Sequence, residues 1–369
     1  MVRLLAAPAA GKPGHGRDDR ARDGRAGSAA EPVIWARAEG CRVTLANGRE
    51  LLDLTGGFGV AALGHRNPRI LEAWREQEVV HALGDLADAE VTLRLREALP
   101  RPAKLGVTGE DAVEIALRTA LLATGRPGIV AFDGAYHGTG LLALAATGFE
   151  RFREPFAQWL PGPVYRRAYG EDPGPLPEDA GCVIVEPVQG RAGSRVPPDD
   201  FLRILRLRCD ESGALLIVDS IFAGLGRVGE MWPGEEVADV LCVGKALGGG
   251  LPLSAALFYR DGLEAVWQLG PEDVYTHTHV GNPLASAAAL VVLQEAPKLL
   301  DRVREAGERF ERAGWRGRGL LRAREGAAED ALARGVIVVP AGLDGSLIQA
   351  TPPLTITDAE LDEALERLS

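Results

Sequence analysis

Lys245 is the residue of this sequence best suited to covalent chemistry. The lysines of the chain are Lys12, Lys104, Lys245 and Lys298. A desolvated lysine can lose its proton and attack a carbonyl group, whereas an arginine stays protonated. Lys245 follows the apolar run 240–243 and precedes the glycines at 248–250, which let a ligand approach the backbone closely. This segment alone fits a Schiff-base lysine and a surface lysine in a glycine-rich turn equally well.

Two acidic residues stand at the ends of apolar runs that are typical of buried strands. The run 215–219 ends in Asp219, and the run 182–186 ends in Glu186. A carboxylate at such a position is costly to bury unless a cation or a hydrogen-bond donor accompanies it. Asp219 is therefore a candidate functional residue, with a loop cap as the alternative interpretation.

Two further segments follow short apolar runs and open onto turns. Gly109 and Glu110 begin a predicted helix, and the free backbone amides at a helix start favour a phosphate. Most helix starts bind nothing, so this segment indicates little by itself. Tyr136 offers a flat ring beside the turn at Gly138, although a pair such as Tyr136 and His137 more often packs in a core.

The elements that would position these residues alternate between short apolar runs and amphipathic stretches. This alternation is typical of an α/β domain with a mostly parallel sheet. Strands are predicted at 129–132, 182–186, 215–219, 240–243 and 255–259, and helices at 110–124, 198–211 and 283–295. Thr108 is placed to cap the first helix and Gly125 to end it. Ligands of such sheets bind at the carboxyl ends of the strands, where the candidate residues lie.

Changes in composition suggest how the chain is divided. Residues 1–31 lack periodicity and are interpreted as a disordered tail without a signal peptide. Beyond Leu299 the sequence becomes a helix rich in Arg, Glu and Ala, followed by a predicted strand at 335–340 and a terminal helix after Thr357. We therefore expect a large domain at 76–298 and a small domain at 299–369. Residues 32–75 are expected to pack with the small domain.

The overall composition excludes several classes of function. The 41 basic and 52 acidic residues give a net charge of −11, which argues against sequence-independent binding to nucleic acid or to anionic membranes. No stretch approaches the length of a membrane-spanning helix. The cysteines show no CxxC spacing and are expected to be buried, reduced thiols, which suggests the cytoplasm.

Several motifs occur along the chain in one specific order. They lie at 52–57, 63–68, 108–114, 135–138, 185–190, 224–229, 243–252 and 278–285. In these motifs the chain resembles the class III, or ornithine-type, aminotransferases, from about Pro32 to the C-terminus. The resemblance implies a fold-type I α/β enzyme that depends on pyridoxal 5′-phosphate, with a large domain and a smaller α+β C-terminal domain. It also implies a homodimer with shared active sites.

The resemblance assigns roles to individual residues. Lys245 matches the lysine that carries the cofactor and moves the proton, and Asp219 matches the carboxylate that pairs with the pyridine nitrogen. Tyr136 matches the aromatic that stacks on the ring. Thr278 matches a threonine that reaches the phosphate of the neighbouring subunit. The rest of the implied cofactor-binding set is Gly109, Glu110, His137, Glu186 and Phe222.

The departures from the family pattern concentrate around the substrate and the edge of the ring. Ser220 replaces the glutamate that usually follows the ring aspartate, and Phe222 stands where a glutamine or methionine is usual. Glu110 is expected to point away from the phosphate, which its carboxylate would repel. Arg191 stands where an acidic or small residue is usual, and His279 replaces an aromatic. Arg191 is therefore a candidate substrate-binding cation.

The largest departure is Gln349, which stands where many relatives place an arginine that clamps an α-carboxylate. An amide cannot replace that charged, bidentate contact. The predicted reaction is therefore amino transfer from an amine or amino acid donor to a carbonyl acceptor, with a carboxylate that is absent, distant or held elsewhere.

Three alternatives remain open at this level. The first is an aminomutase or racemase of the same family, and the second is a cofactor-binding protein that has lost turnover. The third, a metal enzyme, rests only on the pair His277 and His279, because the sequence shows no third ligand cluster. No metal is therefore predicted.

Overall fold

The computed structural model describes residues 33–270 and 274–369, so the predicted N-terminal tail lies outside the described residues. Within these ranges the strands form three sheets, in the orders β4-β10-β9-β8-β7-β5-β6, β1-β2-β3-β13 and β11-β12-β15-β14. The strands are β1 Trp35–Glu39, β2 Arg42–Leu45, β3 Glu50–Asp53, β4 Ala103–Gly106, β5 Gly128–Phe132, β6 Val164–Arg167, β7 Ala180–Val185, β8 Leu215–Asp219, β9 Val240–Val243, β10 Ser254–Phe258, β11 Arg316–Arg318, β12 Leu321–Glu325, β13 Val336–Ile337, β14 Val339–Ala341 and β15 Leu347–Ala350.

Helices surround these sheets. The α-helices are α1 Gly56–Gly59, α2 Pro68–Arg75, α3 Glu90–Ala98, α4 Gly109–Thr124, α5 Leu141–Ala146, α6 Glu150–Arg153, α7 Phe201–Ser212, α8 Pro283–Glu295, α9 Leu300–Arg312, α10 Ala328–Ala333 and α11 Asp358–Leu368. The short 3₁₀ helices are η1 Gly84–Leu86, η2 Glu154–Trp159, η3 Lys245–Gly248, η4 Leu263–Trp267 and η5 Ala296–Leu299.

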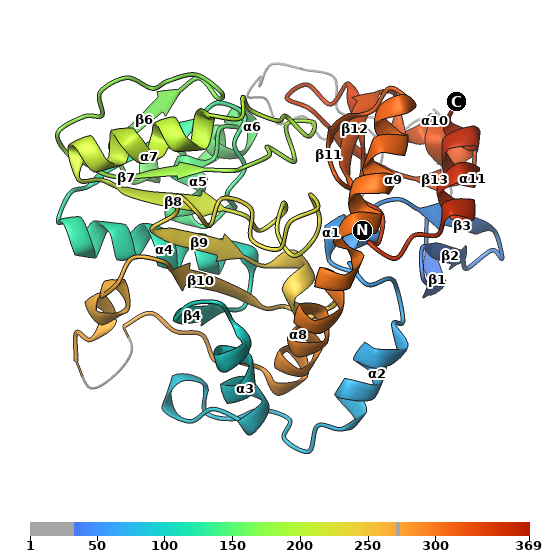
Figure 1. Cartoon of the computed structure of the whole chain (residues 1–369), viewed down its shortest axis with the longest axis horizontal. Coiled ribbons are helices and arrows are strands. Elements are labelled where there is room, and N and C mark those ends of the chain that lie inside the picture. Colours follow the sequence, from blue (N-terminus) through green and yellow to red (C-terminus); the bar gives the residue numbers. More distant parts are fainter. Residues whose placement is uncertain (1–32, 271–273) are drawn as a thin grey trace, which may run out of the picture.

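The seven-stranded sheet forms the centre of the protein and is covered on both faces. Its strands are parallel except β10, which pairs antiparallel with β4 and β9. Side chains of a strand alternate between faces, so Ile217 packs in the core with α4 while Val218 packs in the core with α7. Figure 1 shows α4 and α7 on opposite sides of this sheet. The predicted α/β fold with a mostly parallel sheet is confirmed.

Helix α4 begins and ends where its sequence indicates. Thr108 is the N-cap of α4 and forms a capping box with Asp111. Gly125 ends the helix in a left-handed conformation with φ of 66°. The helix predicted at 198–211 starts later, at Phe201, because Pro197 and Pro198 restrict the preceding backbone.

The C-terminal elements and the first strands lie side by side (Figure 1). β13 pairs in parallel with β3, so Val336 and Ile337 extend the sheet of residues 35–53. The single strand predicted at 335–340 is therefore wrong: the chain leaves one sheet after Ile337 and enters another at Val339. Pro340 fits there because β14 is an edge strand. The division of the chain at 76 and 299 stays a prediction.

Candidate active site

The candidate residues meet in one cavity at the carboxyl ends of the parallel strands. β5, β7, β8 and β9 all end at this edge of the sheet. The cavity has a volume of about 300 Å³. Its lining residues are Thr108, Gly109, Glu110, Tyr136, His137, Gly138, Glu186, Arg191, Asp219, Ile221, Phe222 and Lys245. Of the site residues predicted from sequence, Thr278 and Gln349 are not in this lining.

Lys245 enters the cavity just beyond the end of β9. Gly244 separates it from the strand, and Lys245 itself has φ of 38°, a left-handed conformation that is rare outside glycine. Its Nζ lies 4.1 Å from the centre of the Phe222 ring. Desolvation lowers the pKa of the Lys245 amine, although the charges of Asp219 and Glu186 oppose this shift. The lowered pKa favours the neutral amine, which is the form that attacks a carbonyl group.

Asp219 is the last residue of β8 and is paired with His137. Its Oδ2 lies 2.7 Å from Nδ1 of His137, and its Oδ1 accepts a hydrogen bond from the backbone amide of Ile221 at 3.1 Å. Both side chains are buried. The amide contact is the loop cap considered from the sequence, and the histidine is the partner that a buried carboxylate requires. Within the described part of the protein, Nε2 of His137 has no hydrogen-bond partner.

Glu186 connects two loops of the cavity wall. Its Oε1 accepts a hydrogen bond from the backbone amide of Tyr136 at 2.9 Å, and its Oε2 accepts one from Gly190 at 3.3 Å. Burial, followed by the charge of Asp219, raises the pKa of Glu186 to about 8. Glu186 therefore holds the Tyr136 loop and the Gly190 turn against the end of the sheet.

The start of α4 presents backbone amides to the cavity. Oδ2 of Asp111 accepts hydrogen bonds from the amides of Val107 at 2.9 Å and Thr108 at 2.8 Å. The amides of Gly109 and Glu110 belong to the first helical turn and have no partner within the helix. They are available to an anion, and the helix dipole favours negative charge at this end.

The carboxylate of Glu110 is bound by the loop that follows Gly138. Its Oε2 accepts hydrogen bonds from the amides of Thr139 at 2.8 Å and Gly140 at 3.0 Å. Gly138 has φ of 126°, and a Cβ there would lie 2.6 Å from Cβ of Glu110. The expectation that this carboxylate turns away from a bound phosphate fits these contacts.

An aromatic wall carries the second cation of the cavity. The ring centres of Tyr136 and Phe152 lie 5.6 Å apart. The guanidinium carbon of Arg191 lies 4.7 Å from the centre of the Tyr136 ring and 5.0 Å from that of Phe152. Sequence reasoning missed Phe152, because it lies in no motif and only the packing of α6 brings it to the site.

Ile221 and Phe222 border the cavity just after Asp219. Ile221 packs on the helix start, where a Cβ at Gly109 would lie 3.0 Å from its Cγ2. Phe222 packs so closely on Gly190 that a Cβ there would lie 2.4 Å from its ring. Ile221 was not predicted, although its position two residues after the strand-end carboxylate was a usable signal.

Gln349 and Thr278 lie outside the lining of this cavity. Gln349 is buried on β15, and its Nε2 donates hydrogen bonds to the carbonyl oxygen of Gly190 at 2.6 Å and to Oγ of Ser194 at 3.1 Å. Its amide thus holds the turn that carries Arg191. Thr278 is exposed, and its carbonyl oxygen is contacted by the ring of His81.

A lysine just beyond one strand of a mostly parallel sheet and an aspartate at the end of the neighbouring strand are the arrangement of a fold-type I transferase. The sequence matches the family aminotransferase class-III over residues 25–369. The chain therefore belongs to the class III aminotransferases, which depend on pyridoxal 5′-phosphate.

Known relatives cover nearly the whole chain. The chain is 36% identical over 374 residues to the acetylornithine aminotransferase of Methanopyrus kandleri, covering 92% of this chain and 94% of the relative. It is 32% identical to a 5-aminovalerate aminotransferase of Pseudomonas aeruginosa, with 92% and 93% covered. The crystal structure of the ornithine aminotransferase from Toxoplasma gondii superimposes with a TM-score of 0.84 at 27% identity, covering 93% of this chain and 90% of that one.

The cavity residues fit pyridoxal 5′-phosphate. The cofactor has an aldehyde, a basic ring nitrogen, a flat ring and a phosphate. The cavity offers an amine with a lowered pKa at Lys245, a buried carboxylate at Asp219, an aromatic ring at Tyr136 and the amide-rich start of α4. Each group of the cofactor thus has a partner of suitable chemistry.

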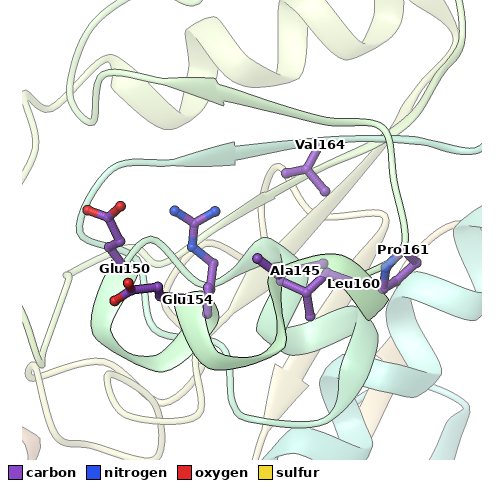
Figure 2. Close-up of a pocket in the computed structure, with 8 residues that line it drawn as sticks. Ala145, Glu150, Glu154, Leu160, Pro161 and Val164 are labelled. Atoms are coloured by element: carbon purple, nitrogen blue, oxygen red, sulfur yellow. The ribbon is translucent and has the colours of Figure 1, made fainter. Parts of the chain in front are cut away.

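Other parts of the described structure show no second site built from the predicted residues. A second cavity, of about 350 Å³, lies beside α6 and β6, with the carboxylates of Glu150 and Glu154 at one end and Leu160 and Pro161 at the other (Figure 2). None of the predicted site residues lines it. Residues 33–270 and 274–369 contain no group of three or more His, Cys, Asp or Glu side chains suited to a metal ion. No helix in these ranges is both long and apolar enough to cross a membrane.

Proposed function

We propose that Lys245 is the covalent attachment point of the cofactor in this aminotransferase. The observation that carries the proposal is that Lys245, Asp219 and the start of α4 line one cavity. Bound pyridoxal 5′-phosphate would supply an aldehyde for attachment and a ring that withdraws electrons from the substrate carbon. The chemistry then depends on how the residues of this chain hold and move protons.

Each residue has a role that follows from its contacts. The neutral amine of Lys245 acts as nucleophile and, once displaced, accepts and returns a proton at Nζ. Asp219 keeps a positive charge at the ring nitrogen, and His137 orients this carboxylate through the 2.7 Å contact between Nδ1 and Oδ2. Tyr136 stacks on the ring, and the amides of Gly109 and Glu110 bind the phosphate.

Glu186 and Phe222 support the cofactor indirectly. Glu186 holds the backbone of Tyr136 at 2.9 Å, which fixes the stacking ring. Phe222 closes the space beside Lys245, with its ring 4.1 Å from Nζ. We propose that both residues border the cofactor rather than take part in proton transfer.

Covalent attachment is tested by mass spectrometry. Borohydride reduction of protein loaded with pyridoxal 5′-phosphate should fix the cofactor on the peptide that contains Lys245. The same treatment of Lys245→Ala should leave this peptide unmodified. A reduced cofactor found only on other lysines would refute the assignment.

The overall reaction is tested in a single half-reaction. The loaded protein is mixed with 5-aminovalerate, 4-aminobutyrate, acetylornithine or an alkylamine, without an acceptor. Amino transfer predicts a carbonyl product and one equivalent of pyridoxamine phosphate. An aminomutase or racemase would instead return an amine with a moved amino group or inverted configuration.

We also propose that the active unit is a homodimer in which Thr278 reaches the phosphate of the partner subunit. Its exposure and its absence from the cavity of its own chain support this role. The exposed apolar side chains of Val80, Leu83 and Leu86 offer a surface for a second copy. Mixing Lys245→Ala and Thr278→Ala subunits tests the proposal, because only a mixed dimer regains one intact site. Mixed protein no more active than its two parents would contradict shared sites.

We place the protein in the cytoplasm. Cys41, Cys182, Cys209 and Cys242 are all free and buried, which supports a reducing compartment. Cell fractionation with an antibody against the chain would test the location, and recovery outside the cytoplasmic fraction would contradict it.

A further inference from the structure

We propose that Arg191 is the specificity-determining residue of this site and binds a carboxylate of the substrate at a distance from the reacting amine. This inference rests on the proposed aminotransferase function and names the class of substrate that the site selects. It follows from the position of Arg191, from the lack of a partner for its charge and from the Phe222 ring beside Lys245.

The turn that carries Arg191 is held in place from several sides. The backbone amides of Gly193 and Ser194 donate to the carbonyl oxygen of Gly190, each at 3.0 Å. Gln349 donates to Gly190 and Ser194, as described above, and Nε of Arg316 donates to the carbonyl oxygen of Gly193 at 2.8 Å. Arg191 therefore stands on a fixed backbone rather than on a free loop.

The guanidinium of Arg191 has no acidic partner among the described residues. Its Nε is buried and makes no hydrogen bond there, and desolvation lowers its pKa. Its guanidinium lies over the rings of Tyr136 and Phe152, which leaves its N–H donors for a ligand. A partly buried cation without a counter-ion carries a desolvation cost, so an anion in the cavity would be stabilised.

The two glutamates of the cavity lining are already engaged. Glu186 accepts hydrogen bonds from the backbone at Tyr136 and Gly190. Glu110 accepts hydrogen bonds from Thr139 and Gly140. Neither carboxylate is paired with Arg191, so the positive charge remains for the substrate.

The surroundings of Lys245 decide which carboxylate this is. An α-carboxylate lies one bond from the reacting carbon and would have to be bound close to Nζ. One side of Nζ faces the Phe222 ring, whose centre lies 4.1 Å away and which offers no donor. Arg191 reaches the cavity from another loop, on the wall formed by Tyr136 and Phe152. An acid separated from the amine by several carbons fits this arrangement.

Three compounds of equal chain length test the proposal. They are 5-aminopentanoate, with a distant carboxylate, 2-aminopentanoate, with an adjacent one, and pentylamine, with none. The wild-type enzyme should prefer 5-aminopentanoate to both others in kcat/KM. In Arg191→Met, the kcat/KM ratio of 5-aminopentanoate to pentylamine should fall by about tenfold to a hundredfold, the usual range for a lost charge-assisted hydrogen-bonded pair.

Two further variants separate binding from packing. Arg191→Lys keeps the charge but loses the planar fork, so it should recover only part of the ratio. Arg151→Met is the matched control, because Arg151 stacks on Phe149 and Phe152 without lining the cavity, and it should keep the wild-type ratio. An equal loss of activity on all three substrates in Arg191→Met would show that Arg191 only supports Tyr136, and would overturn the proposal.

A binding measurement keeps this proposal apart from the proposed function. Pentanoate has no amine and cannot react, so calorimetry of the cofactor-loaded enzyme measures carboxylate binding alone. Wild-type protein should bind it about tenfold or more tightly than Arg191→Met does. Equal affinities would refute the role of Arg191 even in an active enzyme. Arg191-dependent binding in a protein without amino transfer would refute only the proposed function.

Discussion

The two halves of the cavity differ in whether their charged side chains have partners of opposite charge. Where β8 and β9 end, Asp219 pairs with His137 at 2.7 Å. The negative charge of Asp219 also acts on the amine of Lys245. At the opposite wall, Arg191 lies on the rings of Tyr136 and Phe152 and pairs with no acid in the described structure. The first half has its opposite charges in place, and the second lacks one.

This difference separates chemistry from selection. In the first half, Asp219 and Lys245 themselves match the family pattern, and their charges are arranged to activate a cofactor that every member shares. The half with Arg191, whose turn is held by Gln349, departs from the pattern, and its unpaired cation would be stabilised by an anion from outside the protein. Variants in the first half should therefore lower activity on every substrate, and variants in the second should change the ranking of substrates.

The largest expected effect belongs to Lys245→Ala. Without the amine, the protein loses its nucleophile and its proton carrier together, so kcat should fall by roughly a thousandfold or more on every amine. Steady-state kinetics with an alkylamine and an ω-amino acid would measure this. Lys298→Ala is the control, because Lys298 is exposed and pairs with Glu295 on the surface. A loss confined to the ω-amino acid would contradict the division into two halves.

Asp219→Asn should follow, with a loss of roughly a hundredfold to a thousandfold in kcat, the range for removing a preorganised electrostatic contact. The amide keeps the shape of the side chain but cannot hold a proton at the ring nitrogen. Rates on two or more donors and the dissociation constant of the cofactor would be measured together. The surface variant Asp172→Asn, which loses a pair with Arg208, should be indistinguishable from wild type. Normal turnover by Asp219→Asn would remove this residue from the mechanism.

Gln349→Ala should act on the second half of the cavity. It leaves the carbonyl of Gly190 and the hydroxyl of Ser194 without their donor, which should lower the free energy of unfolding by about 1–3 kcal/mol. A looser turn should also weaken the preference for a carboxylated amine over an alkylamine. Urea unfolding and paired kinetics would measure the two effects.

Thr351→Val is the matched control for Gln349→Ala. Oγ1 of Thr351 donates to the carbonyl of Thr55 at 2.8 Å, just beyond the same strand but away from the Gly190 turn. It should lose stability without a change in substrate preference. If both variants changed the preference equally, Gln349 would have no special link to the turn.

The sequence predicted the cofactor half of the site more completely than the substrate half. Asp219 ends one short apolar run and Lys245 follows another after Gly244, and that local pattern is visible without a structure. Phe152 gave no such signal, because its place beside Tyr136 depends on how α6 packs. The role of Gln349 was also hidden, since its partners Gly190 and Ser194 are far away in sequence. Long-range contacts of this kind follow from tertiary packing and leave no local periodicity.

The fold shows the same limit. Helix α4 was predicted almost to the residue, because its caps at Thr108 and Gly125 are local signals. The split at Val338 was missed, because two neighbouring pieces of one apolar run pair with different sheets. Pairing with β3 or β15 depends on partners that the run itself does not specify.

One further effect concerns stability alone: its dependence on pH, through Glu186 between the two halves. Its pKa in the folded protein is raised from 4.5 to about 8, so the folded state holds a proton that the unfolded state has released. The stabilisation of the folded state by this proton is fully present below about pH 4.5 and is lost as the pH rises to about 8. Over this range the free energy of unfolding falls by no more than about 1.4 kcal/mol per pH unit. In Glu186→Gln, which mimics the protonated group, this slope should vanish.

Urea unfolding of the cofactor-free protein at pH 5, 6.5 and 8 would measure the difference between wild type and Glu186→Gln. The stability of the variant relative to wild type should rise with pH. Glu150→Gln, at an exposed position, should keep the wild-type slope. If Glu186→Gln instead lost stability relative to wild type with rising pH, the ionised carboxylate would be the favoured form. The hydrogen bonds from Tyr136 and Gly190 would then outweigh burial, and Glu186 would join the charged half of the cavity.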